Sequence, residues 1–343
     1  MSTPINISAS RGAAILGLSK WKTPVQVWLE IVESREPGFC AKNNYELLVK
    51  EENPSMRWGT AFESAIIELA KMKEGCIIHN QEKYFNKHIH KGNKREEQVI
   101  TCHIDGQFSE TGQPLHEGKT TTLFYFADNF GEDGTDQVPM EYQIQCQHQM
   151  ICTGADKVIL SVLVFPKRPE EWEDKNWIVK IHNNEWIMVD GNGITHNQIS
   201  WAKTLSEMGF FHQFTITAHP KLQKSMMKHY SDFWFNNVLK QIPPDPINID
   251  DIKLLCREPV GTIIADENIE RQLSELENIK TEIGQGGSLS KRAAQIKLSI
   301  LEYMRSAEKT IDTESDKKWI LRGSDGKKLA TYGKNKNGEM YFR

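Results

Sequence analysis

Three side chains that could carry out phosphate chemistry lie close together in the middle of the chain. Asp105 lies in the stretch VITCHIDGQF, and Glu117 and Lys119 lie in LHEGKTTT. Because side chains alternate along a β-strand, Glu117 and Lys119 point to the same face if the second stretch is a strand. If Asp105 lies on a strand paired with it across the intervening turn, its carboxylate reaches that face too. Two acids and a lysine in one place are the groups that phosphodiester hydrolysis requires.

The expected chemistry depends on a divalent cation. Carboxylates hold Mg²⁺, which takes oxygen ligands, and the cation stabilises charge on a phosphate and generates hydroxide from water. Mn²⁺ is expected to substitute. The lysine could orient that water or help to deprotonate it. Asp105, Glu117 and Lys119 match the D-x(n)-E-x-K pattern of the PD-(D/E)XK nuclease superfamily, although a solvated hairpin with the same residues is the alternative.

An upstream glutamate strengthens the first interpretation. MRWGTAFESAIIELAKMKEG is predicted as a helix, with an apolar stripe of Phe62, Ile66, Leu69 and Met72 and with Gly75 at its end. Glu63 lies beside that stripe, where a charge is costly unless it is paired or bound to a metal. The alternative is a boundary glutamate in a surface ion pair.

Two polar segments could contact DNA. In QIQCQHQ, Gln143 and Gln147 are one helical turn apart, with Gln145 and His148 alongside, and amides suit phosphates or base edges. A solvated polar helix is the alternative. Near the N-terminus, Ser8, Ser10 and Arg11 begin a helical segment, where N–H groups and hydroxyls favour an anion such as a terminal phosphate. A simple N-cap is the alternative for either serine.

Composition sets limits on the class of protein. The chain has 343 residues, of which 38% are hydrophobic and 26% charged, as in an ordinary protein of one or two domains. Six scattered cysteines without a C-x-x-C pair argue against a zinc ribbon, an iron–sulfur cluster and a disulfide framework. We find no signal peptide and no apolar run long enough to span a bilayer, so a cytoplasmic protein without a membrane partner is expected.

The net charge of −4 is unevenly distributed. The segments KHIHKGNKR and KLQKSMMKH and the C-terminal tail are basic, and a local basic cleft can hold a phosphate backbone whatever the total charge. His88 and His90 lie in the first of these segments. They are either a pair of metal ligands or, as the basic loop around them favours, solvent-exposed or phosphate-facing residues.

The expected order of elements is helix, helix, strands, helix, strand, which indicates an α/β core with a mixed sheet. Strands are expected in GCIIHNQEKYF, KREEQVITCHIDGQF and LHEGKTTTLFYF, with SETGQP as a turn between the last two. VPMEYQIQCQHQMICTG is predicted as a helix ending at Gly154, and DKVILSVLVF as a buried strand. Further on, we predict a hairpin in KNWIVKIHNNEWIMV, helices in GITHNQISWAKTLSEMG and KLQKSMMKHYSDFWFNNVLKQI, a helical hairpin around GQGGS, and a final strand pair in LATYGKNKNGEMYF.

Five blocks in this order resemble the YqaJ-like viral recombinase family, which includes bacteriophage lambda exonuclease. They are SASRGAAILGLSKWKTPVQVWLE, RWGTAFESAI, HIDGQF, LHEGKT and QIQCQHQMICTGAD, and they cover roughly residues 7–165. The resemblance implies a PD-(D/E)XK restriction-endonuclease-like core, with a mixed central sheet flanked by helices, and a helical C-terminal extension. On this basis we predict a nuclease core at residues 1–166 (or continuing to about 245), an insertion and helical elements packing on the core at 167–245, and a helical hairpin with a short strand pair at 246–343.

The resemblance also implies roles for individual residues. Asp105 and Glu117 would be metal carboxylates, with the Gly118 carbonyl also near the metal, and Glu63 would support the site. Lys119 would act on the nucleophilic water. Gln147 would bind DNA, and Ser10 would match a serine near a 5′-phosphate pocket. The family's phosphate-pocket arginine usually precedes the serine, whereas here Arg11 follows it, so end recognition is less secure than cleavage.

The expected activity is Mg²⁺-dependent 5′→3′ exonuclease action on double-stranded DNA ends, which releases mononucleotides and leaves a 3′ single strand. The resemblance further implies a homotrimer, a single-strand annealing protein as partner, and a phage or prophage gene acting in the bacterial cytoplasm. Two alternatives stay open: a structure-specific or Cas4-like nuclease, and a catalytically inert DNA-binding recombination factor. The lack of a cysteine cluster counts against the Cas4-like form, and the presence of Asp105, Glu117 and Lys119 counts against the inert one.

Overall fold

The computed structural model describes residues 5–48, 52–109, 113–182, 185–282, 287–311, 314–315 and 317–343. These residues divide into two compact units, each discontinuous in sequence. One unit comprises Asn6–Ser19 and Val49–Asp232, and it contains all of the predicted site residues. The other comprises Met1–Ile5, Lys20–Leu48 and Phe233–Arg343. The domain boundaries expected near residues 166 and 245 stay a prediction.

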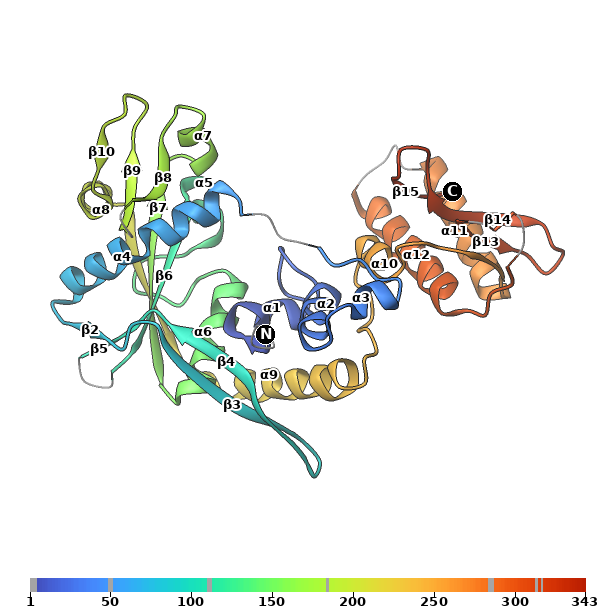
Figure 1. Ribbon diagram of the computed structural model, residues 1–343, viewed down its shortest axis with the longest axis horizontal. Coiled ribbons are helices and arrows are strands. Elements are labelled where there is room, and N and C mark those ends of the chain that lie inside the picture. Colours follow the sequence, from blue (N-terminus) through green and yellow to red (C-terminus); the bar gives the residue numbers. More distant parts are fainter. Residues whose placement is uncertain are drawn as a thin grey trace. The chain divides into compact units, whose positions relative to one another are not determined.

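A five-stranded mixed sheet forms the centre of the first unit (Figure 1). Its strand order is β11 (Phe211–Thr217), β7 (Lys157–Phe165), β6 (Leu115–Thr122), β5 (Gly106–Phe108) and β2 (Ile78–His79). β6 and β7 are parallel, and the other neighbours pair antiparallel. Residues 158–165 of β7 are buried on both faces, which explains the unbroken apolar run VILSVLVF. The predicted α/β class with a mixed central sheet flanked by helices is confirmed.

Helices cover both faces of this sheet and bury alternate residues of β7 (Figure 1). α4 (Pro54–Glu74) and α8 (Gln198–Glu207) pack with Ile159, Leu163 and Phe165. α6 (Met140–Thr153) packs with Leu160, Val162 and Val164. The Asn53 side chain accepts the Met56 N–H (2.9 Å) at the start of α4, and Gly75 (φ 65°) and Gly154 (φ 78°) end α4 and α6 as predicted. Met72, predicted on the apolar stripe of α4, is instead 61% exposed.

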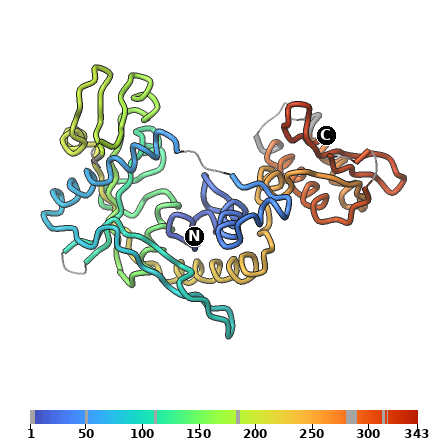
Figure 2. The backbone as a smooth tube through the Cα atoms, viewed as in Figure 1, coloured from blue at the N-terminus to red at the C-terminus, as the bar shows by residue number. Residues whose placement is uncertain are grey.

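A long antiparallel hairpin joins this unit through a bend at Asp105. It consists of β3 (Lys83–Lys91) and β4 (Lys94–Ile104), and β1 (Ile7–Ser8) pairs parallel with β4. The trace in Figure 2 follows β4 into β5, so one strand path serves two sheets. His88 and His90 lie in strand β3 and not in a loop, which corrects the expectation for this segment, since the turn falls at Gly92.

The segment between β7 and the end of the unit holds a second small sheet. After α7 (Pro169–Glu173), the strands β8 (Ile178–His182), β9 (Glu185–Val189) and β10 (Thr195–His196) pair antiparallel, which confirms the predicted hairpin. α8 and α9 (Pro220–Phe233) confirm the predicted helices. Strand β11 was not predicted, and helix α5 (Leu123–Asn129) lies where an extended strand was expected.

The other unit begins with α2 (Pro24–Arg35), which the Thr23 capping box starts, and α3 (Phe39–Lys42). It continues with the π-helix η2 (Trp234–Val238), α10 (Ile249–Leu255), and the predicted helical pair α11 (Glu267–Glu282) and α12 (Gly287–Ser306). The predicted strand pair, β14 (Lys328–Lys334) and β15 (Met340–Phe342), is confirmed, but it belongs to a four-stranded sheet with β12 (Gly261–Ile264) and β13 (Lys318–Arg322). The C-terminal part is therefore helical with a sheet of its own.

Two predicted turns fall partly outside the described residues: SETGQP, which includes 110–112, and GQGGS, which includes 284–286. All six cysteines are free thiols. No helix in the described ranges is both long enough and apolar enough to span a membrane.

Candidate active site

Asp105 lies at the bend where β4 leaves the hairpin and β5 enters the central sheet. Its Oδ2 accepts a hydrogen bond from the Gly118 backbone N–H on β6 (2.7 Å), which fixes the carboxylate against the neighbouring strand. Burial and then the nearby charge of Glu117 raise the pKa of Asp105, to about 8 in total, although Lys119 and the Gly118 N–H oppose the shift. The carboxyl group of Asp105 at this bend is therefore a weaker acid than an ordinary aspartic acid side chain.

Glu117 and Lys119 point to the same face of β6, as their spacing predicts. The Glu117 side chain is only 3% exposed, and its Oε1 accepts a hydrogen bond from the Lys119 ammonium. The Lys119 nitrogen also lies 5.9 Å from the centre of the Tyr142 ring on α6. Burial works to lower the pKa of Lys119, but the charges of Glu117 and Asp105 outweigh it and raise that pKa above its ordinary value. Lys119 is thus an ammonium group at neutral pH.

Two glutamine side chains of α6 donate hydrogen bonds to the Glu117 carboxylate. Gln145 Nε2 donates to Glu117 Oε1 (2.5 Å), and Gln149 Nε2 donates to Glu117 Oε2 (2.5 Å). Gln149 is 1% exposed and was missed by sequence reasoning. The signal that could have found it is its spacing of four residues from Gln145, because residues i and i+4 share a helix face.

Glu63 projects from α4 as a half-buried side chain. Burial raises its pKa, the charges of Glu82 and Glu117 raise it further, and Lys119 opposes them. Glu63 therefore lies within the electrostatic field of Glu117 and Lys119, and the structure brings together all four predicted catalytic residues.

Gly118 is required where α4 packs against β6. A Cβ atom built there would lie 3.1 Å from Ile66 Cγ2 and 3.5 Å from Asp105 Oδ2. A Cβ atom at this position would be tight against Ile66 of the helix and in van der Waals contact with the Asp105 carboxylate. The neighbouring residue, His116, is fully buried against Phe108, and burial lowers its pKa to about 3, so it is a neutral core residue.

The donor set fits a hard divalent cation. Asp105 and Glu117 supply carboxylate oxygens close to one another, and the pKa of Asp105 is raised by burial and then by the charge of Glu117, which a cation would offset. Within the described ranges, no group of three or more His, Cys, Asp or Glu side chains is arranged to hold a metal ion. Mg²⁺ is usually bound by one or two carboxylates and keeps several waters.

Two of the residues predicted to bind DNA are used inside the fold. Gln147 is 1% exposed; its Nε2 donates to the Thr217 carbonyl (2.7 Å), and its Oε1 accepts from the His219 N–H (2.9 Å) and from Gln223 (3.0 Å). His148 is fully buried between the Thr101 carbonyl (3.0 Å) and the Tyr230 hydroxyl (3.3 Å), and burial lowers its pKa to about 4. Direct DNA contact by either side chain would require breaking these bonds.

The remaining predicted contacts lie nearer the surface. Gln143 is half-buried and donates to the Asp136 carbonyl (2.5 Å). Arg11 Nη1 donates to the Ser8 hydroxyl (3.0 Å), which lies 3.1 Å from the Ser10 hydroxyl. Ser8 is the N-cap residue of the short helix η1 (Ala9–Arg11), but its side chain makes no capping hydrogen bond there. The three residues form one polar group beside β1.

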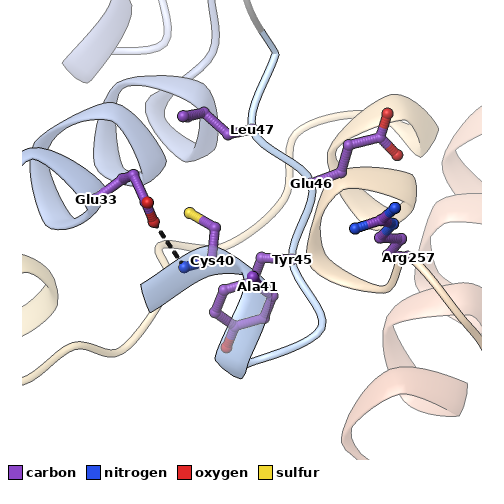
Figure 3. A pocket seen from close by; sticks show the side chains of 7 residues that line it. All are labelled: Glu33, Cys40, Ala41, Tyr45, Glu46, Leu47 and Arg257. Atoms are coloured by element: carbon purple, nitrogen blue, oxygen red, sulfur yellow. Dashed lines mark hydrogen bonds between the residues drawn. The ribbon is translucent and has the colours of Figure 1, made fainter. Parts of the chain in front are cut away.

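A pocket in the other unit has a different character (Figure 3). It measures about 340 Å³, and its lining includes Glu33, Cys40, Tyr45 and Arg257. The Glu33 carboxylate accepts the N–H groups of Gly38 (2.6 Å) and Cys40 (2.8 Å), so its charge stabilises the turn before α3. Burial raises the pKa of Cys40 to about 12, which keeps the thiol protonated and unreactive. This pocket therefore offers no reactive thiol, and the catalytic candidates remain Asp105, Glu117, Lys119 and Glu63.

Comparison with known proteins finds a family model that agrees with the resemblance in the sequence, and solved structures that are distantly similar. The alkaline exonuclease (LHK-Exo) from Laribacter hongkongensis is 15% identical, with a TM-score of 0.42 over 69% of this chain and 89% of that one. A phage-related exonuclease from Haemophilus somnus 129PT is 14% identical, with a TM-score of 0.44 over 70% of this chain and 97% of that one. No curated protein is a significant match. The family model described as "YqaJ-like viral recombinase domain" matches residues 4–156. The matched residues, which are similar to that family, include all eleven of the side chains predicted to form the site and Gly118 between them.

Proposed function

We propose that this protein is a divalent-metal-dependent deoxyribonuclease that degrades one strand of duplex DNA from its 5′ end during phage-type recombination. The observation that carries the proposal is the convergence of Asp105, Glu117 and Lys119 at one place in a YqaJ-like domain. The products would be mononucleotides and a 3′ single strand.

Asp105 and Glu117 would hold the cation, with the Gly118 carbonyl as a further oxygen ligand and Glu63 as a supporting acid. When bound, Mg²⁺ (or Mn²⁺ in its place) supplies stabilisation of charge on the phosphate and lowers the pKa of water. Gln145 and Gln149 orient Glu117 by donating to both of its oxygens. The chain thus fixes the carboxylate before any ligand arrives, which reduces the reorganisation needed for reaction.

Lys119 acts as a donor in this proposal. Because its pKa is raised, its ammonium can donate a hydrogen bond to a water or to a phosphate oxygen but cannot accept a proton. Its contacts with Glu117 and the Tyr142 ring hold the ammonium in place. Of the two roles left open by the sequence, orientation of the nucleophilic water is the one that this charge state favours.

End recognition would depend on the group formed by Ser8, Ser10 and Arg11, which offers hydroxyls and a guanidinium to a terminal phosphate. Gln143 would contact the same strand. We further propose a trimer, a single-strand annealing protein as partner, and action in the cytoplasm of a bacterial host.

Two other functions are weaker. The six free cysteines are scattered, and no cluster of ligating side chains occurs in the described part of the chain, which disfavours a Cas4-like nuclease. An inert DNA-binding factor does not explain why Lys119, Gln145 and Gln149 all converge on Glu117.

A digestion series tests the proposal. Linear duplexes with 5′-phosphate or 5′-hydroxyl ends and a closed circular duplex are incubated with Mg²⁺, and the products are resolved on a gel. We expect mononucleotides from the linear duplexes and no cutting of the circle. Cutting of the circle would instead favour an endonuclease, and complete inactivity with Mg²⁺ and Mn²⁺ would favour the inert factor.

A further inference from the structure

Two basic segments have no part in the proposed catalytic site. Residues 83–95 contain five Lys and Arg residues and no Asp or Glu, and residues 219–229 contain three Lys and again no acid. The whole chain has a net charge of −4, so positive charge is concentrated in these segments. Such concentration creates a local positive potential despite the acidic total.

The two segments meet in the fold, although they are far apart in sequence. The first comprises strand β3 and the first residues of β4, and the second forms most of helix α9, which the hairpin crosses in Figure 1. Asp232 joins them: its Oδ1 lies 2.8 Å from the Lys91 nitrogen, and its Oδ2 lies 3.3 Å from the Lys228 nitrogen. One carboxylate thus holds two ammonium groups close together, and the pair keeps an excess of positive charge.

Three more lysines, Lys94, Lys221 and Lys224, lie near Lys91 and Lys228. Lys221, Lys224 and Lys228 are three and four residues apart and exposed, on the face of α9 opposite the buried Met226 and Tyr230. On the hairpin, Lys94 is the cross-strand partner of Lys91, and paired residues point to the same face of a sheet. We call Lys91, Lys94, Lys221, Lys224 and Lys228 the basic ridge.

Most of this charge is not compensated within the protein. In the described ranges, no ion pair involves Lys94, Lys221 or Lys224, whereas Asp232 pairs with both Lys91 and Lys228. Lys94, Lys221 and Lys224 therefore contribute positive charge that a polyanion can neutralise.

The lysines of the basic ridge on α9 lie on the face of that helix that points away from α6, so two helices, α9 and α6, separate them from the catalytic candidates. On α9, Gln223 Nε2 donates to Gln147 Oε1 of α6 (3.0 Å), and the Tyr230 and His148 rings lie 5.5 Å apart. Gln145 and Gln149, which hold Glu117, lie about 200° around α6 from Gln147, at 3.6 residues per turn. The diameter of a helix is roughly 10 Å, and a duplex of about ten base pairs is roughly 34 Å long at about 3.4 Å per base pair, so one duplex is long enough to contact both places.

We propose that the basic ridge binds the phosphate backbone of duplex DNA and holds the duplex beside the active site. This inference rests on the proposed function and extends it to the part of the substrate that is not being cut. Lys221 to Lys228 spans roughly 10 Å of helix, a length over which duplex DNA carries about six phosphate charges. Lysines of this kind act as point charges, so the binding is independent of base sequence.

The test compares two triple variants. The ridge variant carries Lys94→Gln, Lys221→Gln and Lys224→Gln, and the matched control carries Lys175→Gln, Lys180→Gln and Lys203→Gln, three exposed lysines on other elements of the same unit. Binding to a short labelled duplex is measured by fluorescence anisotropy in EDTA, over a series of salt concentrations. Circular dichroism checks that both variants are folded.

We expect the slope of log Kd against log salt concentration to fall by about 2.7 in the ridge variant, at ~0.9 per lost phosphate contact, and to stay unchanged in the control. Arginine at the same three positions should restore it, since the charge is retained. An unchanged slope and Kd in the ridge variant would overturn the proposal. The proposal would also be overturned if the ridge variant lost the same binding affinity for single-stranded DNA as for duplex DNA. If the wild-type protein binds duplex through the ridge but never cuts it, the proposed nuclease function is wrong and the ridge proposal holds. If the protein cuts duplex but the ridge variant binds as tightly as the wild type, the ridge proposal is wrong and the nuclease function holds.

Discussion

At the residue scale, Asp105 determines how the metal-free site responds to pH. Its pKa is raised from the model-compound value of 3.8 to about 8, chiefly by burial and then by Glu117. Between these two values the folded state binds more protons than the unfolded state, so this carboxyl group makes the protein lose stability as the pH rises through that window. Above pH 8 the loss is complete. A divalent cation reverses the effect because it binds the deprotonated form.

Asp105→Asn should therefore abolish cleavage and stabilise the metal-free protein. Asparagine resembles the protonated carboxyl group, so we expect the free energy of unfolding at a pH of about 8.5 to increase by about 1–3 kcal/mol, less than the full value for such a shift because partial exposure screens the charge. Urea unfolding in EDTA measures it. At a pH near 4 the variant and the wild type should be equally stable. Mg²⁺ should stabilise the wild type alone, and a variant less stable than the wild type at high pH would contradict the account of Asp105.

Arg11 is the second residue with a separable role. Its guanidinium donates to Ser8, and the Ser8 and Ser10 hydroxyls are adjacent, so the three residues offer donors and positive charge to a terminal phosphate. Arg11→Ala should slow digestion of 5′-phosphorylated ends at least about tenfold more than 5′-hydroxyl ends, as expected for one lost charge-assisted bond. Arg11→Lys should restore part of the difference. Initial rates on the two substrates give the comparison, and equal slowing on both would mean that Arg11 only supports the fold.

At the scale of elements, the two polar faces of α6 have different roles, one in the fold and one at the candidate active site. One face, with Gln147 and His148, is bonded into the protein, and the other, with Gln145 and Gln149, holds Glu117. Gln149→Leu should lower the maximal rate about tenfold or more, because Glu117 Oε2 loses its buried donor and its orientation.

Gln213→Leu is the matched control for this change. Gln213 is a buried amide of β11 that donates to the Ser161 hydroxyl (3.2 Å), away from Glu117. Both variants should lose comparable stability in urea unfolding, but only Gln149→Leu should lose activity and Mg²⁺ affinity, the latter measured by calorimetry. Equal loss of activity in both would mean that the effect is one of packing alone.

The same helix shows what the sequence could and could not predict. The period of two in a strand fixes which residues of β6 share a face, so Glu117 and Lys119 could be placed together from their spacing alone. Asp105 joins them only through the pairing of β5 with β6 across the turn. The helical period of α6 predicts two polar faces, Gln143 with Gln147 and Gln145 with Gln149, but which one meets β6 depends on packing between distant segments. Strand β11 was missed because FHQFTIT pairs at the sheet's edge through its backbone, with His212 and Gln213 interrupting the apolar pattern. The segment LFYF continues a strand pattern in composition yet forms α5, which buries none of its residues fully.

At the scale of the whole molecule, the charge distribution limits how a single chain can stay on DNA. With a net charge of −4, the chain as a whole repels a polyanion, and attraction depends on local groups such as the basic ridge. Contacts of this kind weaken steeply with salt. A single chain held only by them would release the duplex often, whereas a closed ring would retain it between successive cuts.

The trimer implied by the family resemblance therefore predicts a specific kind of kinetics. Light scattering should give a particle of about three times 39.4 kDa, since cyclic symmetry closes with identical interfaces. Digestion of a long labelled duplex is started together with an excess of unlabelled duplex as a trap. Digestion should continue on the labelled molecules that are already bound. The number of nucleotides removed per binding event should change little with moderate salt, even though the rate of binding falls. The ridge variant should bind more slowly but, once bound, digest as far as the wild type, because enclosure and not charge retains the DNA. A monomeric particle whose digestion stops when the trap is added would exclude the ring and leave the chemistry at Asp105 and Glu117 unaffected.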